Sequence, residues 1–466
     1  MLVSFSVENF RSFRGEQTLN MAASTRVGAG HDEHCHKIQG ESIRLLPLAV
    51  MYGANGAGKS NLIKAMRYAV WMVLDGPRPG KQTAREPFAH LEETRTEPST
   101  FDFRFLTRDR IYRYGFKVSD TQVESEWLIV EANSQEKIIY ERTTDSNGKM
   151  EVKAGAPLVD EAVADRSHIL AFSKFATSSG RANQLFLRAI HENVDTPFQG
   201  DWVEPAISWF KNSLAIIDPG EHVRGLHRML TTSADFAAFS SSYLKSVSTG
   251  VDELVRVRTE ELPFERARDM IPLGLAADLT EAEVSQEQVA DYTLPNGAMM
   301  ALAKGAQGGY FVHTIATKHH AEHGKTFELP LAAESDGTRR LLHLLPILYP
   351  KTVNAEVVVI DEIDRSLHPL LTRQFIEAFL KVALHSRRQM VLTTHDTILL
   401  DLELLRRDEI WFVEKDENSA TSMYSLSEFP VRKDFRLHRG YMQGRFGAIP
   451  FLGDLEKLTS DMEATA

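Results

Sequence analysis

The strongest constraint on this chain is a glycine-rich stretch from Gly53 to Ser60, with the sequence Gly-Ala-Asn-Gly-Ala-Gly-Lys-Ser. The apolar residues 48–51 before it predict a buried strand, and the periodic apolar residues of 59–74 predict a helix after it. Glycines let the backbone turn tightly around an anion, and the helix N-terminus adds its dipole to the N–H groups that point there. A strand, such a loop and a helix, in that order, predict a phosphate-binding loop for a nucleoside triphosphate.

Two side chains of this loop have distinct expected roles. Lys59 is expected to reach the β- and γ-phosphates, and the Ser60 hydroxyl is expected to bind Mg²⁺. The other contacts are expected from backbone N–H groups and from the first turn of the helix. The residues that we expect to hold the nucleotide here are Gly53, Ala54, Asn55, Gly56, Ala57, Gly58, Lys59, Ser60 and Asn61.

A second motif, far along the chain, complements the loop. The apolar run 357–360 predicts a buried strand, and it ends in the acidic pair Asp361 and Glu362. Strand ends of this kind lie at the carboxyl edge of a parallel sheet, where ligands bind in open α/β folds. We expect Asp361 to hold Mg²⁺, and Glu362 to polarise the attacking water as general base.

Composition places the chain among ordinary globular proteins. It has 466 residues, of which 43% are hydrophobic and 25% charged, so two or three units with their own cores are expected. No apolar run approaches the roughly 18 residues of a membrane span, and the start lacks a secretory signal. Cys35 is the one cysteine, so disulfides cannot hold the fold together, and we expect a cytoplasmic protein. Because no apolar run could span a membrane, we expect no membrane partner. The net charge of −11 argues against a general nucleic-acid coat but leaves a local basic groove open.

Periodicity predicts an α/β fold interrupted by an insertion. Alternating residues predict strands at 2–7 and 17–22, and short polar turns predict that three later strands form an antiparallel meander. We expect 1–155 and 306–466 to fold together as one head, with a mainly helical insertion at 156–305. The meander strands are expected at 100–107, 111–118 and 123–132, and further strands at 309–317, 325–331, 356–360, 389–394 and 409–414. Helices are expected at 159–191, 202–214, 234–247, 280–291, 341–348 and 369–384.

A short polar motif precedes the expected helix that begins near residue 339. Ser335 or Asp336 is suited to cap this helix, and Gly337 lets the backbone approach an anion. Taken alone, the motif is most often only a helix cap. Its position just before the strand that ends in Asp361 is what makes a role at the nucleotide worth considering.

These motifs, in this order, resemble the RecF/SMC/OLD-type branch of the ABC ATPases. The resemblance covers about residues 1–130 and 310–450, and its joint pattern is far more specific than its single motifs. The resembling segments are the opening at 7–13, the phosphate loop at 53–62, the signature at 334–338, the D-loop at 366–369, the switch-histidine motif at 393–396, and the tail at 440–450, which is similar to stand-alone bacterial members often found in antiviral defence operons.

The resemblance implies further site residues and a partner. It implies that Arg11 and Ser12 lie around the nucleotide and that His395 senses the γ-phosphate. It also implies that Ser335 and Gly337 close over the nucleotide of a facing copy, in a head-to-tail dimer or higher oligomer. One departure from the family pattern concerns the Q-loop, whose glutamine contacts Mg²⁺ or water. Gln82 is the available glutamine between Leu74 and Thr100, but its surroundings do not match the family pattern, so this contact stays open.

The implied fold is an ABC-type P-loop head with a mixed sheet and an antiparallel β subdomain. The implied function is an ATP-binding and hydrolysing switch or sensor in antiphage defence, with a separate effector such as a nuclease, because no nuclease motif follows residue 450. The alternative is a RecF/SMC-like repair ATPase that clamps DNA. An ATPase subunit of a membrane transporter fits poorly with the opening motif and the variant signature.

Two other sequence features allow more than one interpretation. The first is a group of metal ligands at close spacing, for which a solvated loop is the favoured interpretation because no second ligand pair appears at zinc-finger spacing. Its residues are His31, Glu33, His34, Cys35 and His36. A basic segment is consistent with contacts to nucleic-acid phosphates or to an acidic partner, and equally with a solvated face. Its residues are Arg432, Lys433, Arg436, Arg439 and Arg445.

Overall fold

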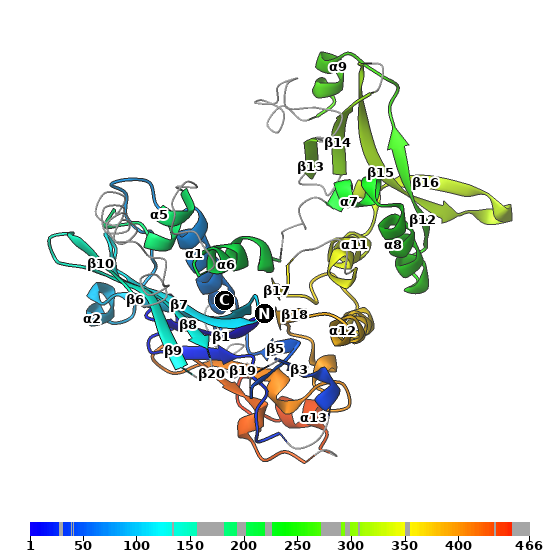
Figure 1. The fold of residues 1–466 in the computed structure, drawn as a ribbon. Helices are drawn as coiled ribbons and strands as arrows, with labels where there is room; N and C mark the ends of the chain where they lie inside the picture. The colour runs from blue at the N-terminus through cyan, green and yellow to red at the C-terminus, as the bar shows by residue number, and fades with distance from the viewer. Residues whose placement is uncertain are drawn as a thin grey trace, which may run out of the picture. The chain divides into compact units, whose positions relative to one another are not determined.

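A computed structural model of the chain separates into two compact units (Figure 1). Unit 1 comprises Met1–Ile216, Ala355–Glu362 and Ala383–Ala466, and unit 2 comprises Ile217–Asn354 and Ile363–Val382. Each unit is described by itself. The residues that the structure describes are 1–27, 31–38, 40, 42–132, 135–155, 181–192, 202–219, 226–271, 290–293, 299–305, 308–349, 355–432 and 435–449.

An antiparallel sheet of seven strands forms one layer of unit 1. Its order is β10-β9-β8-β7-β6-β1-β2, so the expected meander and the expected N-terminal strand pair are both confirmed. The β6–β7 turn consists of Arg108 and Asp109, both at positive φ, as a two-residue hairpin that follows the strand twist requires. The strands are β1 (Leu2–Glu8), β2 (Gln17–Asn20), β6 (Ser99–Thr107), β7 (Arg110–Val118), β8 (Val123–Ala132), β9 (Gln135–Thr144) and β10 (Met150–Ala154).

A mixed sheet of six strands carries both nucleotide motifs. Its order is β11-β17-β18-β5-β19-β20, with β17, β18, β5 and β19 parallel and β20 antiparallel. Strand β5 from the N-terminal third therefore pairs on both sides with strands of the C-terminal third, as we expected. The strands are β11 (Leu214–Ile217), β17 (Val357–Ile360), β18 (Gln389–Thr393), β5 (Leu48–Tyr52), β19 (Ile410–Lys415) and β20 (Thr421–Ser425).

Helix α1 (Lys59–Leu74) follows the glycine-rich loop with the bounds that the sequence predicts. Its apolar stripe, including Leu62, Met66 and Ala69, is buried in the same core cluster as Phe101 of β6 and Val359 of β17. This cluster joins the two sheets through the helix, so the hydrophobic effect fixes the helix N-terminus over the edge of the mixed sheet. Shorter helices of unit 1 are α2 (Glu92–Thr96), α5 (Phe186–Glu192), α6 (Glu204–Ser208) and α13 (Leu437–Met442).

Unit 2 contains its own antiparallel sheet and several helices. The sheet has the order β12-β15-β14-β13, with β16 also paired to β15. Its strands are β12 (Val251–Arg258), β13 (Ala290–Thr293), β14 (Met299–Lys304), β15 (Tyr310–His320) and β16 (Thr326–Pro330). Its helices are α7 (Leu226–Thr232), α8 (Ala234–Ser246), α9 (Phe264–Asp269), α11 (Asp336–Leu348) and α12 (Pro369–Leu384), the last of which continues into unit 1.

The described part of 156–305 contains helices α5 to α9 together with strands β11 to β14. Most of our helices at 159–191 and 280–291 lies outside the described residues, and residues 290–293, at the end of the second, form β13. Strand β12 was missed because most of its side chains are at least partly exposed, so its stability comes from pairing with the long strand β15. The boundaries at 155/156 and 305/306 stay a prediction.

No helix among the described residues combines the length and apolarity needed to cross a membrane.

Candidate functional site

The glycine-rich loop is held by close packing that excludes side chains. Gly58 has φ 116°, and a Cβ at this position would lie 2.2 Å from Thr421 Oγ1. A Cβ on Gly53 would lie 2.3 Å from the carbonyl oxygen of Val413 in β19. Glycine is therefore required at both positions, once by the left-handed backbone and once by the approach of a neighbouring strand.

The buried Lys59 side chain folds along the loop that it follows. Its Nζ donates to the Gly53 carbonyl at 2.7 Å and to the Ala54 carbonyl at 3.2 Å. The loop borders a cavity of about 440 Å³ in unit 1, and Lys64 of α1 and Lys415 of β19 also line it. Three lysines around one cavity favour a polyanionic ligand such as a triphosphate. The complete lining is Asn55, Gly56, Ala57, Gly58, Lys59, Ser60, Asn61, Lys64, Glu362, His395 and Lys415.

The acidic pair is organised by a threonine of the neighbouring strand. Thr393 Oγ1 donates to Asp361 Oδ1 at 2.6 Å and accepts from the Glu362 backbone N–H at 2.8 Å. Thr393 is fully buried, and Glu362 has φ 49°, a conformation that non-glycine residues adopt at a cost. One hydroxyl therefore fixes both the buried Asp361 carboxylate and the strained backbone that carries Glu362.

On the expectation from the sequence that this cavity hydrolyses ATP, we expect Thr393→Val to slow that reaction by about 10- to 100-fold, the usual cost of losing a group that orients a metal ligand. The valine leaves a buried carboxylate without its hydroxyl donor, so unfolding becomes easier by about 1–3 kcal/mol. Steady-state ATPase assays over a Mg²⁺ titration, together with thermal unfolding, measure both effects. Thr393→Ser keeps the hydroxyl and is the matched control. Equal Mg²⁺ dependence in the valine and serine variants would show that Thr393 has only a packing role.

His395 reaches the cavity from the end of β18. The chain around it is fixed by Thr394, whose N–H donates to the Met51 carbonyl at 3.2 Å and whose hydroxyl accepts from the Asp396 N–H at 3.0 Å. Asp396 then caps the short helix Thr397–Leu399 through the Ile398 N–H at 3.0 Å. These local bonds turn the chain directly after the strand, and His395 lines the cavity together with Glu362.

The two residues expected from the opening motif do not line the cavity. Ser12 is buried behind the loop, where its Oγ accepts from Asn61 Nδ2 at 2.7 Å and from Thr421 Oγ1 at 2.8 Å. Arg11 forms an ion pair with Glu86. Ser12 therefore supports the first turn of α1, and a direct nucleotide contact from either residue stays a prediction.

The signature motif lies in unit 2. Ser335 is exposed, and its Oγ accepts from the Thr338 N–H at 3.1 Å, so it is the N-cap of α11. A Cβ on Gly337 would lie 2.8 Å from the Ser366 carbonyl, which explains why glycine is needed there.

Gln82, the weak match to a Q-loop glutamine, does not line the cavity at the phosphate loop. It lines a different hollow of about 490 Å³.

The residues at the cavity suit Mg²⁺. This ion prefers hard oxygen ligands, usually one or two carboxylates together with phosphate oxygens and water. The Ser60 hydroxyl, the Asp361 carboxylate and the Glu362 carboxylate offer such atoms from the loop and from the end of β17. The donor set therefore fits Mg²⁺ better than a metal that requires nitrogen or sulfur.

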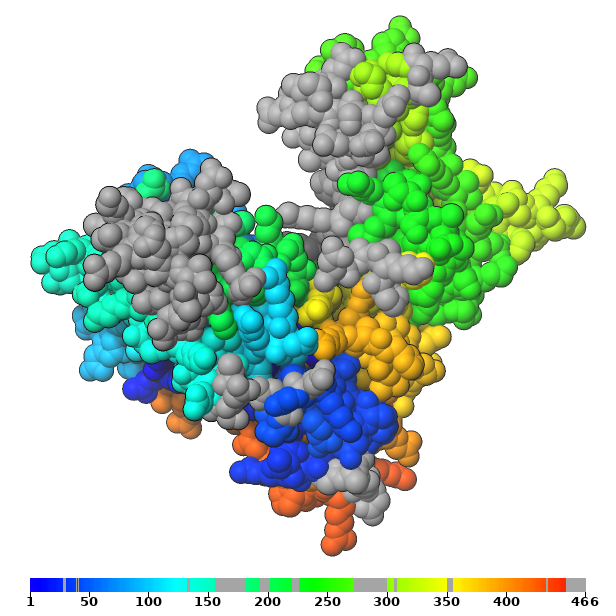
Figure 2. Space-filling model, viewed as in Figure 1, coloured from blue at the N-terminus to red at the C-terminus, as the bar shows by residue number. Residues whose placement is uncertain are grey.

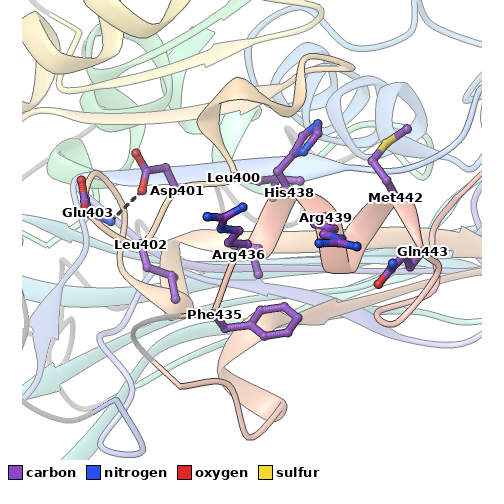
Figure 3. Close-up of a pocket in the computed structure, with 11 residues that line it drawn as sticks. Leu400, Asp401, Leu402, Glu403, Phe435, Arg436, His438, Arg439, Met442 and Gln443 are labelled. Atoms are coloured by element: carbon purple, nitrogen blue, oxygen red, sulfur yellow. Dashed lines mark hydrogen bonds between the residues drawn. The ribbon is translucent and has the colours of Figure 1, made fainter.

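Part of the basic segment lines a separate groove of unit 1, of about 640 Å³ (Figure 3). Arg436, His438 and Arg439 lie along α13 and are exposed, while Asp401 and Glu403 lie on the opposite side. Arg445 does not join them, because its guanidinium lies over the Phe435 ring, 4.6 Å from the centroid. Of the remaining two basic residues, Arg432 is exposed, and Lys433 lies outside the described residues.

Comparison with known proteins identifies one family. The sequence profile described as "AAA domain, putative AbiEii toxin, Type IV TA system" matches residues 48–174 and 206–401, more than half of the chain. None of the curated proteins matches the chain.

Three solved structures are similar to the chain only at low scores. The SMC head domain from Thermotoga maritima is 12% identical, covers 91% of this chain and 98% of its own, and has a TM-score of 0.35. An SMC head bound to the C-winged helix domain of ScpA is 13% identical, with coverages of 91% and 97% and a TM-score of 0.39. An SMC head with an extended coiled coil from Pyrococcus furiosus is 10% identical, with coverages of 91% and 96% and a TM-score of 0.31. These scores carry no functional argument.

Proposed function

Because the chain belongs to the family described as an AAA domain, putative AbiEii toxin, Type IV TA system, we propose that it binds ATP with Mg²⁺ and hydrolyses the γ-phosphate bond. The observation that carries this proposal is the cavity where the phosphate loop meets Glu362 and His395. Residues from both ends of the chain line this cavity, and they combine the charge that a triphosphate needs with a carboxylate that is able to accept a proton.

Each residue has a distinct role in the proposed reaction. Lys59 and the loop N–H groups would hold the phosphates, while Ser60 and Asp361 would hold Mg²⁺, which would neutralise phosphate charge. Glu362 takes the proton of the water that attacks the γ-phosphorus, and ADP leaves with the electrons of the broken P–O bond. His395 contacts the γ-phosphate and thereby distinguishes ATP from ADP. Thr393 acts as a positioning residue for the Asp361 carboxylate and for the backbone that carries Glu362.

We place the second half of each site on another copy of the chain. Ser335 and Gly337 of one copy are proposed to close over the phosphates held by its partner, in a head-to-tail dimer or a higher oligomer. The exposure of Ser335 at the start of α11 supports this arrangement, because a helix N-terminus is suited to an anion. ATP then joins two copies and hydrolysis releases them, so the nucleotide acts as a switch.

We propose antiphage defence as the cellular role of this cytoplasmic switch, with a separate effector such as a nuclease or toxin. The description of the family and the tail motif at 440–450 support this role. The test is a plaque assay with cells that express the chain and the product of its neighbouring gene. Protection should require both genes and should disappear with Lys59→Ala. Protection by the Lys59→Ala variant would contradict a role that depends on ATP.

The groove of Figure 3 favours a second candidate, a repair ATPase that clamps DNA. Here DNA affinity should rise with ATP and fall steeply with salt, because cations released from the phosphates drive binding. Replacing both Arg436 and Arg439 by glutamate should flatten the dependence of affinity on salt, whereas the exposed pair Arg14 and Arg26 provides a matched charge-reversal control. Fluorescence anisotropy with duplex DNA measures this. Salt-independent or absent binding would leave defence as the better proposal.

A further inference from the structure

A cluster outside the nucleotide site brings together three potential metal ligands. His31, Glu33 and His34 each offer one ligand atom, and these atoms lie within 4.8 Å of one another. The 3₁₀ turn Asp32–His34 causes this, because residues three apart in such a turn lie on the same side. The two imidazole rings therefore stack, with their centroids 4.9 Å apart. In the loop that we expected to be solvated, Asp32 and Glu33 are exposed, whereas His34 is buried.

Each imidazole is also fixed by a bond from its other nitrogen. His31 Nε2 lies 3.0 Å from the Leu402 carbonyl oxygen, and His34 Nδ1 lies 3.3 Å from both carboxylate oxygens of Glu409. A histidine that binds a metal almost always donates its second N–H to a carbonyl or a carboxylate in this way. In the tautomer that donates these N–H groups, the lone pairs are on His31 Nδ1 and His34 Nε2.

Glu33 places a carboxylate beside one of these nitrogens. Its Oε1 lies 3.4 Å from His31 Nδ1, so in this tautomer a proton or a metal ion is suited to lie between them. A proton gives a simple ion pair between these two side chains. A metal ion also satisfies His34, whose ring is stacked on the same side. The second arrangement accounts for all three side chains, whereas the first accounts for two.

The surroundings hold this cluster in place before any ligand binds. Arg406 contacts Asp32 at 3.2 Å and Asp408 at 3.0 Å, and Asp408 accepts from the Ser24 N–H at 2.8 Å. The N-terminal loop is thus bound to the segment around residues 402–409. Figure 2 shows blue N-terminal residues and orange-red C-terminal residues of unit 1 next to one another. A site whose outer bonds already exist loses little entropy when it binds a metal.

We propose that His31, Glu33 and His34 bind Zn²⁺, with water in the fourth position. Two imidazole nitrogens and one carboxylate form a borderline donor set that zinc accepts in tetrahedral geometry. The ion joins the N-terminal loop to the segment around 402–409 through the two histidines and their outer bonds. This site uses ligands from one turn, so it needs no second pair of ligands at zinc-finger spacing.

The test is a zinc titration of the nucleotide-free protein against a chromogenic chelator. Wild type should bind one equivalent, and His31→Ala and Glu33→Gln should each weaken binding by about 10-fold or more. The matched control is His385→Ala, which changes an exposed histidine of the same unit and should bind zinc like wild type. Cobalt(II) provides a second readout, because a tetrahedral site gives intense visible absorption that His31→Ala should abolish.

His31 is the better residue to replace, because its side chain is 27% exposed while His34 is buried. Circular dichroism of each variant verifies that the fold is retained. Equal zinc affinity in wild type and His31→Ala would overturn the proposal. So would wild type that binds no zinc at micromolar concentrations, which would leave only the ion pair between His31 and Glu33.

Discussion

Replacing Glu362 by glutamine is expected to slow ATP hydrolysis by about 10²- to 10⁴-fold, the usual contribution of a general base, while ATP still binds. Glutamine has nearly the same shape as glutamate but is a poor proton acceptor, so the attacking water keeps its proton. The Thr393 bond to the Glu362 backbone does not involve the side chain, and we expect the strained conformation at this position to persist. ATP should therefore accumulate in the sites and hold the copies together.

Size-exclusion chromatography with light scattering, with ATP and with ADP, measures this trapped assembly. The Glu362→Gln variant should form a dimer or larger species only with ATP, while wild type returns to the smaller species as ATP is consumed. Glu403→Gln is the matched control, because Glu403 is exposed and lines the separate groove. Full turnover in Glu362→Gln would remove Glu362 as the base.

The sequence predicts the mixed sheet and α1 well because these elements have strong, local signals. Residues 357–360 are apolar throughout and fully or almost fully buried, as expected for a strand covered on both faces. Helix α1 begins at Lys59 because Gly58 has a left-handed backbone that ends the loop. Where composition, periodicity and a motif agree in this way, the local structure follows from the sequence.

The residues that position the acidic pair or reach the cavity from other strands could not be predicted in the same way. Thr393 bridges Asp361 and Glu362 only because β17 and β18 pair in one particular parallel register, and a register between distant strands leaves no local sequence signal. Lys415 reaches the cavity because β19 pairs with β5, again at long range. In unit 2, β12 was missed because its exposed alternation is too weak to predict a strand.

Joining two defective copies is expected to restore activity that neither has alone. Lys59→Ala removes the amine that holds the phosphates, and Ser335→Asp places a negative charge where the facing copy is proposed to hold them. Each variant alone should lose at least about 100-fold in turnover, as expected when a charge contact to the transferred phosphate is removed. Aspartate is also a good N-cap, so Ser335→Asp keeps the cap of α11, and Ser335→Thr is its matched control.

The two variants are purified separately and mixed in equal amounts, so that about half of the dimers that form with ATP contain one of each. In a mixed head-to-tail dimer, both changes fall in one site while the other site is intact, so turnover of the mixture should return to about a quarter of wild type. If Ser335 instead acted within its own copy, each copy would carry a defect and the mixed dimer would stay as inactive as the single variants. ATPase turnover of the mixture therefore decides whether a second copy completes the site.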